Sequence, residues 1–459
     1  MSSPDRPSGT PSDPPLLPRP GAGAPSFGET LAWLDRHINL EAIEAGRAGS
    51  FGLPSLERIA ALVGALDDPQ ATYPVVHVTG TNGKGSTSRM TAAILQACGL
   101  AVGTYTSPHL ERINERLVFD GAEISDDAFA GALGTIAEIE RFLGIRATWF
   151  ELVTAGAYTW FADMAAEAVV AEVGLGGRFD ATNVADGDVA VVTNVELDHT
   201  QILGPTRELI ASEKAGIIKS GSLLVLGEED PALAAIFEAE AERVGARAIW
   251  RRGEEFGCSD DRLAVGGRFV DLWTPLGQFS EVLLPLYGAH QADNAAAAVA
   301  AAQGFLGTTI DPEVVSGALA SIKVPGRLEV VRRHPLVVLD GAHNPAGAAA
   351  AGQALTEDFA AASRVVVVMG CLRGRDPGEL LVALGPERLS VVVACRPPSP
   401  RANDPESVVE AAQALGIAAE QSETITEALE RALEIAERDD LVLVTGSLYV
   451  VGAARSALS

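Results

Sequence analysis

A lysine lies among three glycines in the segment VTGTNGKGST, at residues 78–87. Glycines in such a turn allow backbone N–H groups to approach phosphate oxygens, and a helix that follows favours an anion at its N-terminus. Lys84 is then placed to reach the β and γ phosphates of a nucleotide. A hydroxyl from Ser86 or Thr87 would face Mg²⁺. The pattern predicts a site for an anionic nucleotide.

The spacing of this loop is shorter than the usual G-x-x-x-x-G-K-[ST], and Gly85 separates the lysine from the hydroxyl residues. The alternative is a tight connection between a strand and a helix that binds nothing. Lysine is rare in the chain: of 34 basic residues only Lys84, Lys214, Lys219 and Lys323 are lysines, which leaves 34 − 4 = 30 arginines. Each lysine is therefore a candidate for chemistry that arginine cannot perform, whether as a compact point charge or as an amine that can lose its proton.

Two further polar residues follow apolar runs that read as strands. Glu172 ends AVVAEV, and His199 follows DVAVVTNV in the sequence LDHT. Because the carboxyl ends of parallel strands meet at one edge of a sheet, we expect these side chains to converge on a ligand crevice. For His199 the alternative is a histidine that caps the start of a helix.

The elements that must position these residues alternate between strands and helices. PVVHVTG precedes the glycine loop, and STSRMTAAILQACG follows it as a helix. Two helical segments come earlier, within residues 27–66, and residues 246–287 are β-rich ahead of the alanine-dense helix 291–307. The pattern predicts an α/β fold with a mainly parallel sheet.

Pro325 and Gly326 predict a linker. Beyond it, four short β-rich runs separated by helical segments predict a smaller α/β unit with a cleft between the two units. We expect a disordered tail at residues 1–25, an ATP-binding domain at 26–321 and a C-terminal domain at 322–459.

The composition of the chain argues against several classes of function. The net charge of −27 argues against a general nucleic-acid binder, and no apolar run is long enough to suggest a membrane span. The N-terminus lacks the pattern of a secretory signal. Four cysteines stand far apart, which favours reduced, buried thiols in a cytoplasmic protein over disulfides or a zinc site.

The whole set of motifs resembles the Mur ligase superfamily of ATP-dependent amide-bond ligases, and most closely its folylpolyglutamate synthase branch, including forms that are also dihydrofolate synthases. The matches occur in family order from about residue 27 onward. They are GTNGKGST, TYTSPHLERINERL, EVGLGGRFDATN, TNVELDHTQILG, SEKAGIIK, GAHQADNAAAA, PGRLE, DGAHNPAG and TGSLYVVG.

The resemblance implies a P-loop-type ATPase domain, a smaller Rossmann-like C-terminal domain and an Mg²⁺ centre, with two Mg²⁺ sites and a monovalent cation such as K⁺. Its metal ligands would be Ser86 or Thr87, Ser107, Glu172, His199 and Lys214. Lys214 would act as a carbamate, the CO₂ adduct of its amine, whereas the residue type alone also allows a lysine paired with Glu213 or solvated. We expect Lys219 to be a surface charge.

For ATP, the resemblance implies contacts from both domains. Asn294, which from the sequence alone suits a helix N-cap, would recognise adenine beside Gln291. The resemblance implies catalytic roles for Lys84, His199, Lys214, Asp340 and His343. The other implied ATP-binding residues are Thr81, Asn82, Gly83, Gly85, Ser86, Thr87 and Arg327.

The acceptor would be a folate or dihydropteroate, ligated to L-glutamate through an acyl phosphate. Phe150 could support a pterin ring or lie in the core, and the arginines in SPHLERINERL could equally form charge pairs on a helix. The implied acceptor residues are Ser107, Pro108, His109, Arg112, Arg116, Phe150, Arg178, Asp180 and Ser447.

Three alternatives stay open from the sequence. The first is a folylpolyglutamate synthase that does not use dihydropteroate. The second is a peptidoglycan-precursor ligase of the same superfamily, and the third is a nucleotide-binding regulator that has lost turnover. We expect a cytoplasmic monomer that binds small molecules, with no nucleic-acid or membrane partner.

Overall fold

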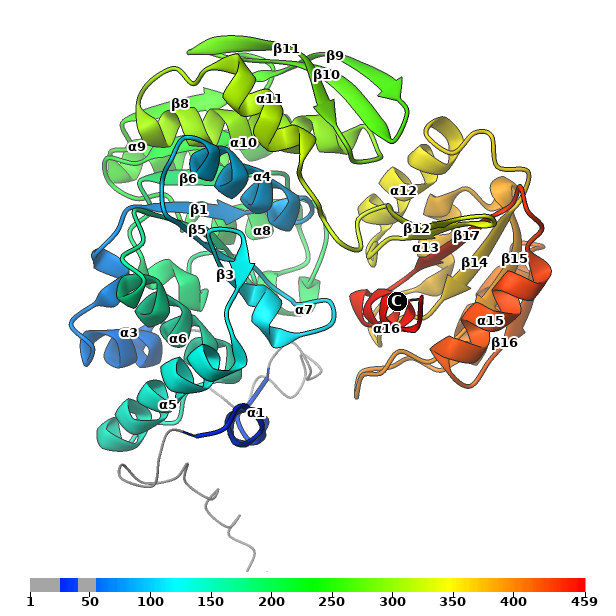
Figure 1. The fold of residues 1–459 in the computed structure, drawn as a ribbon, viewed down its shortest axis with the longest axis horizontal. Coiled ribbons are helices and arrows are strands. Elements are labelled where there is room, and N and C mark those ends of the chain that lie inside the picture. The colour runs from blue at the N-terminus through cyan, green and yellow to red at the C-terminus, as the bar shows by residue number, and fades with distance from the viewer. Residues whose placement is uncertain (1–24, 40–54, 459) are drawn as a thin grey trace, which may run out of the picture.

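Residues 25–39 and 55–458 are described by a computed structural model, shown in Figure 1. Most of the predicted tail, residues 1–24, lies outside this range. An eight-stranded sheet forms the centre of the N-terminal part, in the order β4-β3-β2-β5-β1-β6-β7-β8. Neighbouring strands from β2 to β8 pair in parallel, and β3 and β4 extend one edge in antiparallel pairing. The predicted mainly parallel α/β sheet is confirmed. Its strands are β1 Val75–Thr79, β2 Val102–Tyr105, β3 Leu117–Phe119, β4 Ala122–Glu123, β5 Ala168–Glu172, β6 Val189–Val192, β7 Leu223–Leu226 and β8 Ala248–Arg251.

Helices cover both faces of this sheet because the central strands are apolar on both sides. Val76 and Val78 pack in one core with the alanine-rich helix α10, whereas Val75 packs in the opposite core with α5 and α6. This alternation is the two-residue period of a strand. The helices of the N-terminal part are α1 Phe27–Leu34, α3 Glu57–Gly64, α4 Lys84–Ala97, α5 Asp126–Leu143, α6 Trp149–Asp163, α7 Thr200–Leu203, α8 Arg207–Ala215, α9 Pro231–Val244, α10 His290–Leu306 and α11 Pro312–Ala320, with short 3₁₀ turns η2 Pro69–Ala71, η3 Ile113–Arg116 and η4 Ala181–Val184.

The β-rich stretch before α10 forms a separate antiparallel sheet in the order β11-β10-β9. Its apolar side chains, including Val270 and Phe279, pack in the same core as α10. It therefore covers the helix layer rather than extending the main sheet, as Figure 1 shows at the top of the view. Its strands are β9 Gly257–Ala264, β10 Gly267–Thr274 and β11 Gly277–Leu284.

A second sheet of six strands forms the C-terminal part, which here means residues 329–458. Its order is β12-β13-β17-β14-β15-β16, with only β12 antiparallel to its neighbour. The four predicted runs are its central strands, and the sequence analysis missed both edges. Its elements are β12 Glu329–Arg333, β13 Leu336–Leu339, α12 Pro345–Glu357, β14 Val365–Met369, α13 Pro377–Leu384, η5 Pro386–Arg388, β15 Leu389–Ala394, α14 Pro405–Ala414, β16 Ala418–Gln421, α15 Ile425–Ile435, β17 Leu441–Thr445 and α16 Leu448–Leu458.

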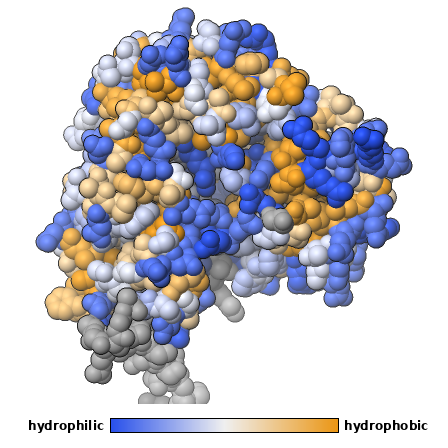
Figure 2. All heavy atoms as spheres, in the orientation of Figure 1, coloured by the Kyte–Doolittle hydropathy of each residue, from blue (hydrophilic) through white to orange (hydrophobic). Residues whose placement is uncertain are grey.

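The two parts lie side by side in Figure 1, joined by the segment between α11 and β12. Pro325 and Gly326 lie in this segment, as predicted for a linker. In the space-filling view of Figure 2, hydrophilic residues gather where the two parts face each other. Domain boundaries at residues 321 and 322 stay a prediction. Among the described residues, no helix has both the length and the apolar character needed to cross a membrane.

Candidate functional site

The glycine loop leads from β1 directly into α4, as the sequence predicted. Gly83 caps the helix with a φ of 84°, a conformation that favours glycine. A Cβ atom there would lie 2.3 Å from Oδ1 of Asn294, and one at Gly80 would lie 1.7 Å from Oγ1 of Thr193. The loop is therefore held against β6 and α10 at a separation that only glycine allows.

The ammonium group of Lys84 lies over this loop. Its Nζ donates hydrogen bonds of 3.1 Å to the carbonyl oxygens of both Gly80 and Thr81. Burial lowers the pKa of Lys84, and the nearby carboxylates of Glu172 and Asp198 oppose that shift. The lysine is thus at the N-terminus of α4, where an anion is favoured.

Glu172 ends β5, the strand that pairs with β1 in parallel. Its side chain is buried, and its Oε2 accepts a hydrogen bond of 3.0 Å from the backbone N–H of Ser107. A Cβ atom at Gly85 would lie 3.4 Å from the same oxygen. Burial raises the pKa of Glu172, whereas Lys84 and the Ser107 N–H lower it. The structure brings the predicted ligands Glu172 and Ser107 together beside the glycine loop.

Lys214 lies in the last turn of α8 and is only 3% exposed. Its Nζ donates a hydrogen bond of 2.7 Å to the carbonyl oxygen of Gly80. Burial, reinforced by the charge of Lys84, holds the pKa of Lys214 well below its usual range. The alternative of a solvated lysine is wrong. Lowered basicity favours the neutral amine that reaction with CO₂ requires.

Lys219 is more enclosed than the surface charge that we expected. Its side chain is 23% exposed, its Nζ donates to the carbonyl oxygen of Asn183 at 3.2 Å, and it pairs with Asp186 at 3.4 Å. Through these two contacts it ties the loop after α8 to the region of η4.

His199 precedes α7 and has a φ of 49°, which is uncommon for a residue other than glycine. His199 is the N-cap residue of α7, as the alternative predicted, but its imidazole is 37% exposed and makes no capping hydrogen bond. Desolvation lowers the pKa of His199 to about 4, although Asp198 raises it. The neutral imidazole is the form that can bind a metal ion.

The carboxylate of Asp198 joins the two parts of the molecule. Its Oδ1 lies 2.5 Å from the guanidinium of Arg375, which comes from the loop after β14. Its Oδ2 accepts a hydrogen bond of 3.0 Å from Nδ2 of Asn344, the N-cap of α12. His343 lies 3.7 Å away through its Nε2. These cationic and N–H partners hold the pKa of Asp198 well below its usual range despite its burial.

Asn344 also binds the glycine loop. Its Nδ2 donates to Oδ1 of Asn82 at 3.0 Å, and Nδ2 of Asn82 donates back to Oδ1 of Asn344 at 3.3 Å. The backbone carbonyl of Asn82 in turn accepts from Oγ1 of Thr193 at 2.6 Å. The phosphate loop, the end of β6 and the start of α12 therefore meet at one point.

Of the remaining predicted residues from Arg327 onward, His343 faces this junction through Asp198. Asp340 is buried and accepts hydrogen bonds from the backbone N–H groups of Leu328 and Ala342, and burial raises its pKa. His343 is oriented by a contact of 2.8 Å between its Nδ1 and the carbonyl of Gly341. The charge of Arg327 lowers the pKa of both Asp340 and Glu172, which puts this arginine within electrostatic range of the site.

Asn294 does not open its helix as expected. Helix α10 begins at His290 after Ala289, so Asn294 lies inside it and is buried. Its Oδ1 accepts from Oγ1 of Thr87 at 3.4 Å, and its Nδ2 donates to Gln291 at 3.0 Å. The N-cap expectation is wrong, because the side chain packs against the phosphate loop instead. Adenine recognition stays a prediction.

The predicted acceptor residues divide between accessible and buried positions. Ser107 touches Glu172, and Arg112 pairs with the exposed Asp126 at 2.8 Å. Arg116 is almost fully buried: its guanidinium lies 4.7 Å from the centre of the Trp149 ring, and its Nε donates to Nδ1 of His109 at 2.9 Å. The Arg116 guanidinium therefore holds the His109 imidazole in place through this hydrogen bond. The acceptor roles of these residues stay predictions.

Four further candidates have structural partners. Phe150 packs on the turn after β5, where a Cβ at Gly174 would lie 2.5 Å from its ring. Arg178 binds Glu240 at 3.0 Å, and Asp180 accepts from the N–H of Leu175 at 2.9 Å. Ser447 is buried and accepts from the N–H of Tyr449. Their contacts hold the turns around the cleft, and direct binding of substrate by them stays a prediction.

Sequence reasoning missed Asp198, Asn344 and Arg375, which connect the two parts. The signal for Asn344 was visible in part, because Asn before Pro345 is a typical helix start. Its side-chain contacts with Asn82 and Asp198 have no such local signal, because those residues lie far away in the chain.

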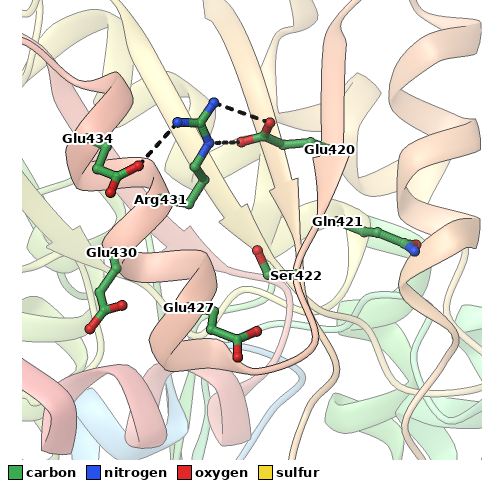
Figure 3. Close-up of a pocket in the computed structure, with 7 residues that line it drawn as sticks. All are labelled: Glu420, Gln421, Ser422, Glu427, Glu430, Arg431 and Glu434. Carbon is green, nitrogen blue, oxygen red and sulfur yellow. Dashed lines mark hydrogen bonds and ion pairs between the residues drawn. The ribbon is translucent and has the colours of Figure 1, made fainter.

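A separate pocket lies at the edge of the second sheet (Figure 3), where Arg431 pairs with Glu420 and Glu434. Its lining is largely acidic and includes none of the predicted site residues.

The residues present fit a magnesium ion. Within residues 25–39 and 55–458, no group of three or more His, Cys, Asp or Glu side chains forms a metal centre. The predicted ligand set instead combines one carboxylate, Glu172, with the imidazole of His199, hydroxyl groups and a carbamate on Lys214. Hydroxyl and carboxylate oxygens are the donors that Mg²⁺ prefers, and buried Ser86 follows the glycine loop directly.

Comparisons with known proteins agree with this geometry. The Mur ligase middle domain matches residues 122–302, and the Mur ligase glutamate ligase domain matches residues 326–448. The dihydrofolate synthase/folylpolyglutamate synthase of Mycobacterium tuberculosis is 37% identical over 442 residues, which cover 88% of this chain and 90% of that protein.

Solved structures extend the likeness to three dimensions. Folylpolyglutamate synthase of Mycobacterium tuberculosis complexed with ADP and AMPPCP aligns with a TM-score of 0.87 at 35% identity, covering 94% of this chain and 98% of the other. A bifunctional folylpolyglutamate synthase/dihydrofolate synthase with Mn, AMPPNP and L-glutamate bound aligns with a TM-score of 0.79 at 31% identity, with coverages of 94% and 98%.

Proposed function

The chain belongs to the dihydrofolate synthase/folylpolyglutamate synthase family of Mur ligases, and we propose that it ligates L-glutamate both to a reduced folate and to dihydropteroate. It is an ATP-dependent amide-bond-forming ligase that uses a divalent metal ion. The observation that carries the proposal is the meeting of Lys84, Lys214 and Glu172 around one glycine loop, to which the C-terminal part adds Asn344.

The reaction begins with the transfer of the γ-phosphoryl group of ATP to the acceptor carboxylate, because a free carboxylate is a poor electrophile for an amine. Lys84 and the loop N–H groups stabilise the charge on the moving phosphoryl group, and Arg327 adds to this from the segment that joins the two parts. The products of the step are ADP and an acyl phosphate. Closure of the two parts keeps water from this intermediate.

The neutral amine of L-glutamate then attacks the acyl carbon. A tetrahedral intermediate forms and collapses, phosphate leaves with its bonding electrons, and the attacking nitrogen loses a proton to give the amide. His343 and Asp340 flank this step in the proposal, which is supported by the approach of His343 to Asp198 across the two parts and by the position of Asp340 three residues before His343.

Mg²⁺ would be held by Ser86 or Thr87 with Ser107, Glu172, His199 and the carbamate of Lys214. When bound, it would neutralise charge on the phosphate oxygens. The buried, weakly basic amine of Lys214 supports the carbamate. Two Mg²⁺ sites, a monovalent cation, a monomeric state and a cytoplasmic location belong to the same proposal.

The decisive experiment is ligation of labelled L-glutamate with ATP and Mg²⁺, run in parallel on dihydropteroate and tetrahydrofolate. Product from both acceptors is the expected result. Product from tetrahydrofolate alone would restrict the enzyme to chain extension. Product from neither acceptor would favour the alternatives, which are a peptidoglycan-precursor ligase and a nucleotide-binding regulator without turnover.

A further inference from the structure

Leu110 and Glu111, in the segment that the proposal assigns to the acceptor, contact helix α16 at the C-terminal end of the described chain. Leu110 packs against the core of the C-terminal part that includes Val450 and Val451 of α16. The main chain approaches equally closely: a Cβ atom at Gly452 would lie 2.1 Å from the carbonyl oxygen of Leu110. Only glycine at this position in α16 allows the segment to dock.

A polar contact lies beside the apolar one. The carboxylate of Glu111 pairs with the guanidinium of Arg455 and accepts a hydrogen bond of 2.5 Å from Oγ of Ser456. Arg455 is also bound by Glu329 at 3.2 Å. The side chains of Glu111 and Arg455 are 22% and 32% exposed, so water screens this ion pair only in part.

The same segment is held by the carboxylate of Glu115, and its other end reaches a predicted metal ligand. The carboxylate of Glu115 accepts hydrogen bonds from three successive backbone N–H groups, those of Leu110, Glu111 and Arg112, at 2.8, 2.7 and 2.7 Å. At the near end, the N–H of Ser107 binds Glu172. A shift of Leu110 relative to α16 is therefore transmitted along the segment to Ser107.

We propose that α16 positions the acceptor segment, through Leu110 on Gly452 and Glu111 on Arg455, so that docking of the C-terminal part and binding of the pteridine carboxylate acceptor are coupled. Gly452, Glu111 and Arg455 are positioning residues that act through Ser107. The inference rests on the proposed function in one respect, which is that residues 107–112 bind the acceptor.

The test compares two glycines that both lie inside helices. Gly452→Ala places a methyl group against the Leu110 carbonyl, whereas Gly317→Ala in α11 has no atom within 4 Å of the new Cβ. Because Leu110 belongs to the N-terminal part, the added methyl group leaves the fold of each part intact. Glu111→Gln removes the charge of the second contact without changing the size of the side chain.

We expect Gly452→Ala to raise the KM for the acceptor about tenfold, within the usual range of coupling between sites, with the KM for ATP nearly unchanged. Glu111→Gln should raise the same KM by a smaller factor, and Gly317→Ala should change neither. The radius of gyration from solution scattering, measured with ATP analogue and acceptor, should be larger for Gly452→Ala than for wild type.

An acceptor KM in Gly452→Ala equal to that in Gly317→Ala would overturn the inference, as would an equal rise in both KM values. If the wild type ligates no glutamate, the proposed function fails instead. In that case the scattering comparison decides alone, because an unchanged radius of gyration in Gly452→Ala shows that the contact does not control docking.

Discussion

Replacing Arg375 with alanine isolates the ion pair that joins the two parts beside the nucleotide site. Asp198 and Arg375 are 7% and 17% exposed, and their charged atoms lie 2.5 Å apart. Truncating one partner of a buried, hydrogen-bonded charge pair costs about 2–5 kcal/mol. Asp198 keeps its contacts with Asn344 and with the N–H of His199, which places the expected loss near the lower end.

A cost of about 2 kcal/mol corresponds to roughly a thirtyfold shift in an equilibrium constant. Because the pair spans the two parts, the cost arises only when they are docked, and separation lets Asp198 regain water. We therefore expect Arg375→Ala to lower kcat about thirtyfold while Tm changes little. The assay is steady-state ligation of labelled glutamate, with a thermal melt of the same preparation.

Arg364→Ala is the matched control. Arg364 pairs with Asp440, whose side chain is 2% exposed, but both residues belong to the C-terminal part. This variant should lower Tm and leave kcat nearly unchanged. The reasoning is refuted if Arg375→Ala retains wild-type kcat, or if it lowers Tm as much as Arg364→Ala does.

Three further predictions follow from the lysines and cysteines. Lys84→Ala should abolish ATP-dependent phosphate release, whereas Lys219→Ala should retain it; equal loss in a phosphate assay would contradict the distinction between them. Lys214→Ala should lose activity that added short carboxylates partly restore, and ligation without any rescue would argue against the carbamate. Iodoacetamide at pH 8 should alkylate the exposed Cys98 in the native protein but Cys371 only after unfolding, because burial raises the pKa of Cys371 to about 12; mass spectrometry would show equal labelling if this is wrong.

The central part of the fold could be predicted because its signals are local. An apolar strand, a glycine turn and a helix follow one another within β1, the loop and α4, and the four buried strands of the second sheet are runs of valine and leucine. The edge strands β12 and β16 were missed because EVVRR and AAEQ are polar. Charged edge strands are common, since they discourage pairing with other chains.

Residues of the candidate site could be predicted only where the local sequence shows that they end a strand or lie in the glycine loop. Glu172 beside the glycine loop follows from parallel pairing of β5 with β1. The expectation for Asn294 failed because its partners, Gly83 and Thr87, lie in another element. The contacts between the two parts could not be predicted for the same reason, since no local sequence pattern indicates which side chains of one part will contact the other. All four cysteines are free thiols, as predicted, but only Cys371 and Cys395 are buried, whereas Cys258 is half-buried and Cys98 is exposed.

The paired amides of Asn82 and Asn344 give the interface a contact of a different physical kind from the ion pair. Each amide supplies one donor and one acceptor to the other and carries no net charge. Its strength therefore does not change with pH or with ionic strength, whereas salt weakens attraction between charges. We therefore expect the phosphate loop to stay in register with helix α12 in concentrated salt, where the electrostatic attraction between the two parts is weakened.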